Sequence, residues 1–507
     1  MRSLTLALLA AAAVAQARLD AVPAHAAALE KRQATAATGS AATAAAATAT
    51  HSRPHRATTT AAAPATAVTT AAGGAVSQKP LASLSRIGTA TTAEVTQPLP
   101  STFAAGATPP VARAPTLPSI ATLNPALYPA LDRIPPIDSP EVKQWLSEID
   151  LDNIPDIPPT APGGCSNSSN AAALSEAGED GRCWWTCGGC TRASDITYCP
   201  TKADWGASFD DGPSPYTPRL LNLLEQQNLK STFFIVGSRA ISRPEMLQTE
   251  YMLGHQISIH TWAHSSLTTL TNEEIVAELG WTKKVIHDIT GVTPNTMRPP
   301  YGDIDDRVRY IALQMGLRPI IWTQSGDQQF DTRDWQIGGG VVSAPDVYRN
   351  FETFLDSASS TLSTGFIVLA HDLYQQSVDL AVDYILPKVI NEGKLTIKTI
   401  AQCLGEDPSQ AYIETSDNKT LPIQTTATVV GATGAGFVDG VGLMYAETAT
   451  TSGGSSTQSG DSPAGTAQSD NQGGGSSGGT SGAEGRSSVG AVVAAVAAVM
   501  GAVAFAA

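Results

Sequence analysis

The chain has 507 residues, a formal net charge of −15 and eight histidines. Its acidic balance, without any cluster of Lys or Arg, argues against nucleic acid as a partner. Length alone would allow about three domains. Composition leaves one region able to form a sizeable core, from about Ile137 to Asp417.

The N-terminal part is expected to direct export and to remain largely unfolded. A basic start, the apolar run Leu4–Val14 and a small-residue cleavage site predict a secretory signal peptide over residues 1–17. Residues 18–136 are rich in Ala, Thr and Pro and poor in aromatic residues, so we expect a disordered, O-glycosylated stalk. The Lys31-Arg32 pair marks a dibasic site that would make residues 18–32 a propeptide.

Cysteines in an exported chain favour disulfides. Residues 137–198 are therefore expected to form a disulfide-stapled extension, and Cys199 and Cys403 to join the ends of the main domain. The Cys187–Cys190 spacing also suggests a zinc knuckle or redox site, but these belong mostly to reducing compartments. The Trp184-Trp185 pair could stack on sugar rings, although burial against the domain is favoured. The six cysteines are Cys165, Cys183, Cys187, Cys190, Cys199 and Cys403.

The main domain is expected over residues 199–417, where short apolar runs alternate with helical patterns. This alternation predicts βα units around a parallel sheet or barrel, with active residues at the C-terminal ends of the strands. The expected strands are 205–209, 232–236, 256–259, 319–322, 366–370 and 395–397. The expected helices are 218–227, 244–253, 272–289, 305–315, 346–362 and 377–390.

Candidate site residues lie at the ends of these strands or in the next turn, so we expect them to meet on one face. His260 and His264, four residues apart, together with one carboxylate of the Asp210-Asp211 pair would form an open three-ligand site for zinc or a similar divalent ion. The second carboxylate would remain free as a general base beside the metal. Trp262, between the two histidines, is expected to pack rather than to react.

Three further residues complete this chemistry, which would be attack of hydroxide on an amide or ester carbonyl. His371 is the candidate acid for the leaving group, and a backbone N–H in the turn at Tyr301 could stabilise the oxyanion. Arg298 would pair with the free carboxylate and keep it ionised. A purely structural salt bridge is an alternative for Arg298, and both uses are compatible.

These segments, in this order, resemble the polysaccharide deacetylases of carbohydrate esterase family 4, which share the NodB homology domain. The resemblance is closest to the fungal GPI-anchored chitin deacetylases of basidiomycete yeasts. It implies an α/β fold, a distorted (β/α) barrel of fewer than eight strands. The five matching motifs are Ser208–Asp211, His260–His264, Arg298–Tyr301, Asp331–Trp335 and Ile367–Asp372.

The resemblance also assigns a role to each site residue. It implies that Asp210 is the general base, that His371 is the general acid, and that the ligands of Zn²⁺ or Co²⁺ are Asp211, His260 and His264. Arg298 would support the base and Asp334 would tune the acid. Trp335 and Leu369 would surround the acetyl methyl group, and Asp210 and the Tyr301 backbone would contact the acetate. Core packing is the alternative for Trp335 and Leu369.

The resulting functional hypothesis is metal-dependent removal of acetyl groups from chitin or chitin oligomers during cell wall remodelling. The same chemistry on another acetylated wall or capsule glycan is one alternative, and a non-catalytic GPI-anchored glycan-binding protein is another. A metal phosphatase is disfavoured because the chain shows no glycine-rich phosphate nest. We expect a monomer.

The C-terminal part predicts attachment to a membrane. Residues 418–480 are a Ser/Thr/Gly-rich linker, and residues 481–507 predict a GPI-anchor signal with attachment within Ser476–Gly482. A retained transmembrane helix is the alternative. The protein would then sit at the outer face of the plasma membrane or in the cell wall. Asn167 and Asn418 begin sequons for N-glycosylation.

Overall fold

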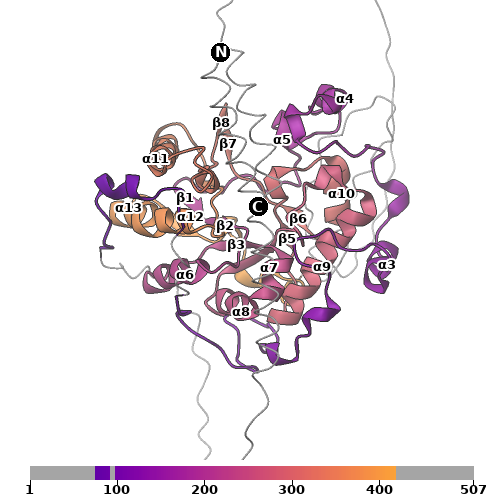
Figure 1. The fold of residues 1–507 in the computed structure, drawn as a ribbon, viewed down its shortest axis with the longest axis horizontal. Coiled ribbons are helices and arrows are strands. Elements are labelled where there is room, and N and C mark those ends of the chain that lie inside the picture. The colour runs from indigo at the N-terminus through magenta and orange to yellow at the C-terminus, as the bar shows by residue number, and fades with distance from the viewer. Residues whose placement is uncertain (1–74, 92–96, 418–507) are drawn as a thin grey trace, which may run out of the picture. The chain divides into compact units, whose positions relative to one another are not determined.

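The computed structural model describes residues 75–91 and 97–417, which form an α/β domain with helices packed around parallel strands (Figure 1). The principal sheet is entirely parallel and has the strand order β2-β3-β4-β5-β6. Its strands are β2 (Ser208–Asp210), β3 (Thr232–Ile235), β4 (Gln256–Ile259), β5 (Thr296–Met297) and β6 (Arg318–Pro319). The predicted α/β fold is confirmed.

A second parallel sheet continues the arrangement, in the order β10 (Thr396–Lys398), β1 (Asp204–Gly206) and β9 (Phe366–Ile367). Its β1 runs into β2 across Ala207, whose N–H donates to β10 and whose carbonyl accepts from β3. Isolated parallel bridges from Asp210 to His371 and from Asp331 to Leu369 connect the ladders further. The described strands therefore form linked sheets rather than one continuous closed ladder, together with the short hairpin β7 (Gln324–Ser325) and β8 (Gln328–Gln329).

The helices bury apolar faces against these strands, α9 and α10 on one side and α11, α12 and α13 on the opposite side (Figure 1). Helix α9 starts at a capping box made by Thr271 and Glu274 and ends at the left-handed Gly291. The principal helices are α6 (Thr217–Gln226), α7 (Gly237–Ser242), α8 (Pro244–Met252), α9 (Asn272–Thr290), α10 (Asp306–Gln314), α11 (Ala344–Ser360), α12 (Gln375–Leu380) and α13 (Leu386–Glu392). Shorter or peripheral helices are α3 (Pro140–Ser147), α4 (Ala171–Ser175), α5 (Trp185–Gly188) and α14 (Ile400–Cys403).

The predicted stalk is wrong for its C-terminal half. Residues 75–91 and 97–136 run along the domain, and Leu84, Val111 and Leu117 are buried in its core. Trp262 donates a hydrogen bond from Nε1 to the Ala130 carbonyl, 3.0 Å away, so this segment also supports the loop that carries the two histidines. Composition misled the prediction because a few apolar residues, widely spaced in extended chain, each contribute burial without a periodic pattern.

The cysteines form three disulfides, Cys165–Cys187, Cys183–Cys190 and Cys199–Cys403. The prediction of disulfides, and of a Cys199–Cys403 bond joining the ends of the main domain, is confirmed. Cys187 and Cys190 bond to other cysteines and not to each other. Trp184 and Trp185 are buried, as favoured.

Within the part of the chain that the structure describes, no helix has the length and apolar character needed to cross a membrane. The signal peptide, the Lys31-Arg32 site, the C-terminal linker, Asn418 and the anchor signal lie outside the described residues. Asn167 lies between two short 3₁₀ helices, Gly164–Ser166 and Ser168–Asn170, and its side-chain amide donates to the Pro162 carbonyl at 2.7 Å.

Candidate active site

The C-terminal ends of neighbouring strands bring the predicted site residues together. Asp210 ends β2 and Asp211 follows it, while His260 follows β4 and Arg298 follows β5. The bridge between Asp210 and His371 places the segment after β9 beside β2. Because parallel strands all end at the same edge of a sheet, residues far apart in sequence share one site.

Three of these residues face a common point. Asp211 Oδ1 lies 3.3 Å from His260 Nε2 and 3.0 Å from His264 Nε2. The ligand atoms of the three residues all lie within 4.8 Å of one another. Asp211 Oδ1 is buried without a hydrogen-bond partner among the described residues, which suits an oxygen that binds a cation. The donor set of one carboxylate and two imidazoles fits a divalent metal ion such as zinc.

The second nitrogen of each imidazole fixes the orientation of its ring. His260 Nδ1 lies 2.8 Å from the Arg298 carbonyl, which can only accept, so Nδ1 carries the proton and Nε2 is free to bind a metal. His264 Nδ1 lies 3.2 Å from the Tyr301 hydroxyl, and the two rings meet edge to face at 4.7 Å. Both rings therefore point Nε2 towards Asp211.

Asp210 occupies a different environment from Asp211, its neighbour in sequence. Its Oδ1 accepts a 2.6 Å hydrogen bond from Nη1 of Arg298, which also donates to Ser208 Oγ at 3.0 Å. Arg298 is fully buried, and its guanidinium carbon lies 3.9 Å from the centre of the Phe234 ring. The other carboxylate oxygen, Oδ2, lies 3.8 Å from His260 Nε2. One oxygen of Asp210 is thus held by the arginine while the other lies near the candidate metal ligands.

His371 is held by Asp334. The Asp334 carboxylate accepts from His371 Nδ1 at 2.7 Å and from its backbone N–H at 3.0 Å. Burial acts to lower the pKa of His371, but Asp334 outweighs it, with smaller contributions from Asp211 and Asp210, and the pKa rises to about 10. His371 is therefore protonated at neutral pH, and its Nε2 can donate.

Three other predicted residues lie in the same motifs. Leu369 is buried and Trp335 half-buried, while Tyr301 is exposed over 46% of its surface. The bridge between Asp331 and Leu369 brings the Asp331–Trp335 segment alongside the strand that leads to His371. An apolar surface next to the acid is compatible with this arrangement.

Comparison with known proteins identifies the family. Residues 197–320 match the family model described as polysaccharide deacetylase. Over 358 residues the chain is 58% identical to chitin deacetylase 1 of Cryptococcus neoformans var. grubii, covering 70% of this chain and 73% of that protein. The chain belongs to the polysaccharide deacetylase family. The resemblance inferred from the five motifs is confirmed.

Further members of the family are more distant. Chitin deacetylase 1 of Saccharomyces cerevisiae is 31% identical over 287 residues, which is 57% of this chain and 83% of that protein. A solved structure of the chitin deacetylase from Colletotrichum lindemuthianum matches 45% of this chain and 100% of its own, with 24% identity and a TM-score of 0.40.

The structure also shows a residue of this polysaccharide deacetylase that sequence reasoning missed. Glu278, buried on α9, accepts hydrogen bonds from the backbone N–H of Trp262 at 2.7 Å and of Ala263 at 2.9 Å, and from Ser265 Oγ at 2.8 Å. It therefore holds the loop between the two histidines. The sequence held one signal of its role: Glu278 is a charged residue at helical spacing from Ile275, on the apolar face of α9.

Proposed function

We propose that this protein hydrolyses the N-acetyl groups of N-acetylglucosamine residues in chitin, giving chitosan and acetate. The observation that carries the proposal is the division of the aspartate pair, with Asp210 held by Arg298 and Asp211 facing two imidazoles. The 58% identical relative from Cryptococcus neoformans, named a chitin deacetylase, supports chitin as the substrate.

Asp211, His260 and His264 would hold Zn²⁺ or Co²⁺. When bound, such an ion lowers the pKa of water and polarises a carbonyl. Asp210, held by the Arg298 guanidinium, accepts a proton from the water that attacks the amide carbon. His371 donates a proton to the amine nitrogen as the C–N bond breaks, so that one amide and one water give one amine and one acetate.

Other residues stabilise and orient the acetyl group in this mechanism. The Tyr301 backbone N–H donates to the oxyanion, whose charge develops only as water attacks. Trp335 and Leu369 provide the apolar surface for the methyl group. Asp334 keeps the His371 ring oriented and its proton available.

The test measures acetate release by the full chain from chitin oligomers, acetylated xylan and peptidoglycan fragments, with and without a chelator. We expect release from chitin oligomers, loss of it with chelator, and recovery with zinc or cobalt. Acetate release only from the other glycans would mean that one of them, and not chitin, is the substrate. No release from any of the glycans would favour a non-catalytic glycan-binding protein.

The roles of the acid and base are tested in the same assay. We expect Asp210→Asn and His371→Ala each to lower kcat by about 10²–10⁴-fold. Asp356→Asn, on the exposed side of α11, removes a carboxylate away from the site and should keep the wild-type rate. Near-normal rates for either active-site variant would show that the mechanism is wrong.

The terminal sequences support a proposal for the cellular placement. We propose that the protein is secreted and held by a GPI anchor attached within Ser476–Gly482. We also propose that it is a monomer. Phospholipase C treatment of intact cells should release it, whereas retention at the surface would favour a membrane-spanning helix.

A further inference from the structure

The turn Pro300–Asp303, beside the candidate metal ligands, has an unfavourable backbone. Tyr301 has φ 60° and ψ 9°, and Gly302 follows with φ 65°, so two successive residues are left-handed. A residue with a Cβ keeps this conformation only where the surroundings hold it. The turn fixes both the Tyr301 ring against His264 and the backbone N–H assigned to the oxyanion. Its support is therefore important for the site.

That support comes from the disulfide-stapled segment Cys183–Cys190. The Trp185 ring lies directly against the turn, since a Cβ built on Gly302 would lie only 2.4 Å from Trp185 Cζ3. Trp185 packs edge to face on Trp322, with ring centres 4.5 Å apart, and Trp322 Cη2 also lies 2.9 Å from the Cβ built on Gly302. Trp185 is 3% exposed, so it fills the space behind the turn and does not present a surface for sugar.

Hydrogen bonds fasten three consecutive residues of the segment to the turn. Trp184 Nε1 donates to Asp303 Oδ1 at 2.8 Å, and the Trp185 N–H donates to the Ile304 carbonyl at 3.1 Å. Thr186 Oγ1 lies within reach of two acceptors, the Gly302 carbonyl at 3.0 Å and Asp303 Oδ1 at 3.2 Å. The backbone after Tyr301 is thus held at several successive points.

Asp303 extends this support to the loop that follows His264. Its second oxygen, Oδ2, accepts from Ser266 Oγ at 2.9 Å and from Thr268 N and Oγ1 at 2.9 and 2.7 Å. Asp303 is buried, and its two oxygens therefore link the segment Cys183–Cys190 to the loop that follows His264.

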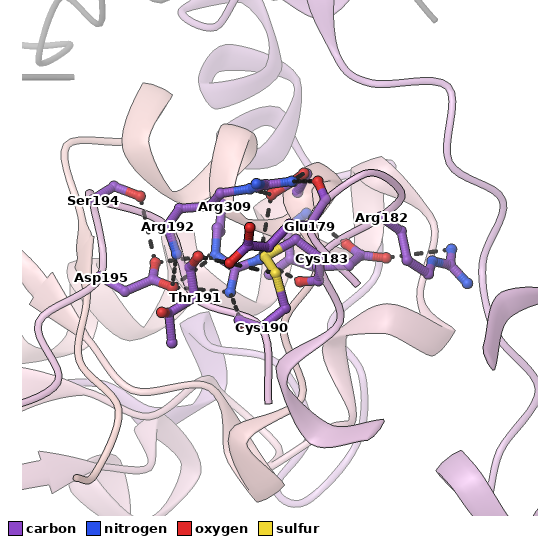
Figure 2. Close-up of polar contacts among 12 residues, drawn as sticks. Glu179, Arg182, Cys183, Cys190, Thr191, Arg192, Ser194, Asp195 and Arg309 are labelled. Atoms are coloured by element: carbon purple, nitrogen blue, oxygen red, sulfur yellow. Dashed lines mark hydrogen bonds and ion pairs between the residues drawn. A yellow bond between two sulfur atoms is a disulfide. The ribbon is translucent and has the colours of Figure 1, made fainter. Parts of the chain in front are cut away.

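The segment is itself anchored to the domain by a buried arginine (Figure 2). Arg309, on α10, donates to the carbonyls of both bonded cysteines, Cys183 at 2.6 Å and Cys190 at 3.1 Å, and pairs with Asp195 at 2.9 Å. Arg309 is 3% exposed, so these interactions are shielded from water. The ends of the segment are fixed both to each other and to the helix that follows the turn.

We propose that the segment Cys183–Cys190 is a positioning element of the active site, acting chiefly through Trp185 and Thr186. It holds the turn Pro300–Asp303 in the conformation that presents Tyr301 to the substrate and to His264. The proposal rests on the proposed function for its kinetic consequence, but the conformational consequence can be measured independently.

The kinetic test compares Trp185→Ala, Trp185→Phe and Thr186→Val in the full chain. We expect Trp185→Ala to lower kcat on chitin oligomers by about 10–10²-fold, because a misplaced donor weakens transition-state contacts. KM and the zinc content should change little, since among the described residues no hydrogen bond or ring contact joins Trp185 to Asp211, His260 or His264. Trp185→Phe should recover most of the rate, and Thr186→Val, which keeps its shape, should give a smaller loss.

Trp205→Ala is the matched control, because Trp205 is also 3% exposed but packs against Phe351 and Phe366, away from the turn. All variants are assayed below their unfolding temperatures. A similar loss of kcat in Trp205→Ala and Trp185→Ala would show that the segment only stabilises the fold, and would overturn the proposal.

Amide hydrogen exchange gives a readout that does not depend on activity. We expect faster exchange at residues 301–304 in Trp185→Ala and Thr186→Val, with little change at residues 232–235 of β3, an interior strand of the principal sheet. Unchanged exchange at the turn would contradict the proposal even if kcat fell. A wild-type protein that releases no acetate would refute the proposed function, while the exchange experiment would still decide whether Trp185 holds the turn.

Discussion

At the scale of single residues, the two adjacent aspartates are of the same type but lie in different environments. Burial acts to raise the pKa of Asp211, but His264 and His260 outweigh it, and the pKa lies well below its usual value. Asp210 stays in the strand and pairs with Arg298, whereas Asp211 turns away with φ 78°. The two carboxylates are therefore accommodated side by side because each has its own partners, the Arg298 guanidinium for Asp210 and two imidazoles for Asp211.

Glu278 is the residue whose replacement best tests how the histidine loop is held. Glu278→Ala would leave the N–H groups of Trp262 and Ala263 without their acceptor, and we expect it to destabilise the protein by about 1–3 kcal/mol. Because the loop carries two of the proposed metal ligands, zinc affinity should also fall, by about 10–100-fold. Calorimetric zinc titration and thermal unfolding measure the two effects.

Glu273→Ala is the control for this prediction, since Glu273 lies on the exposed side of the same helix. It should leave zinc affinity unchanged. An affinity of Glu278→Ala equal to that of the wild type would mean that other contacts suffice to hold the loop.

At the scale of secondary structure, the long helices could be predicted closely. Helix α9 was expected over 272–289 and spans Asn272–Thr290, because its cap residues and apolar periodicity agree. Strand β5 was missed, since two residues, Thr296–Met297, are too short to show a pattern. The helix expected over 377–390 is divided into α12 and α13 by a π-helical turn at Ala381–Ile385, which periodicity does not reveal.

The candidate site likewise contains residues that could be placed from the sequence and residues that could not. Its motif residues could be placed because strand ends meet in any parallel α/β fold. The residues that hold these motifs in position, Glu278, Asp303 and Trp185, could not be found in this way. They act through contacts across the fold, and apart from the place of Glu278 on the apolar face of α9, nothing in the sequence marks them as different from ordinary helix or loop residues.

The disulfides give a prediction at this scale. Bond Cys199–Cys403 closes a loop with a sequence separation of 204, and Cys165–Cys187 one of 22. Loop-closure entropy makes the longer bond more stabilising by about 2 kcal/mol. We expect the Cys199→Ala/Cys403→Ala variant to lose about that much more unfolding free energy, measured with urea, than Cys165→Ala/Cys187→Ala. Equal losses would contradict the entropic account.

At the scale of the whole molecule, buried titratable groups make the stability of this acidic protein depend on pH. His255 is 1% exposed, its Nδ1 accepts the Ser231 N–H at 3.1 Å, and its ring meets Phe233 edge to face at 5.1 Å. This environment suits a neutral ring. Burial, with a smaller contribution from Lys230, lowers the pKa of His255 to about 3.

The folded-state pKa of His255 therefore lies below the unfolded value of about 6.5. Between these values the unfolded chain binds a proton that the folded protein excludes. The stability associated with neutral His255 is complete above about pH 6.5 and is lost as the pH falls towards 3, by at most about 1.4 kcal/mol per pH unit.

His255→Asn isolates this contribution, since the amide oxygen can still accept from Ser231 while the side chain no longer titrates. The difference in urea unfolding free energy between wild type and variant is measured from pH 7 to pH 4.5, so that contributions of all other groups cancel. We expect the difference to shift in favour of the variant by about 1–3 kcal/mol over this range. Parallel curves would mean that His255 is protonated in the folded protein as readily as in the unfolded chain, and that the acid sensitivity arises elsewhere.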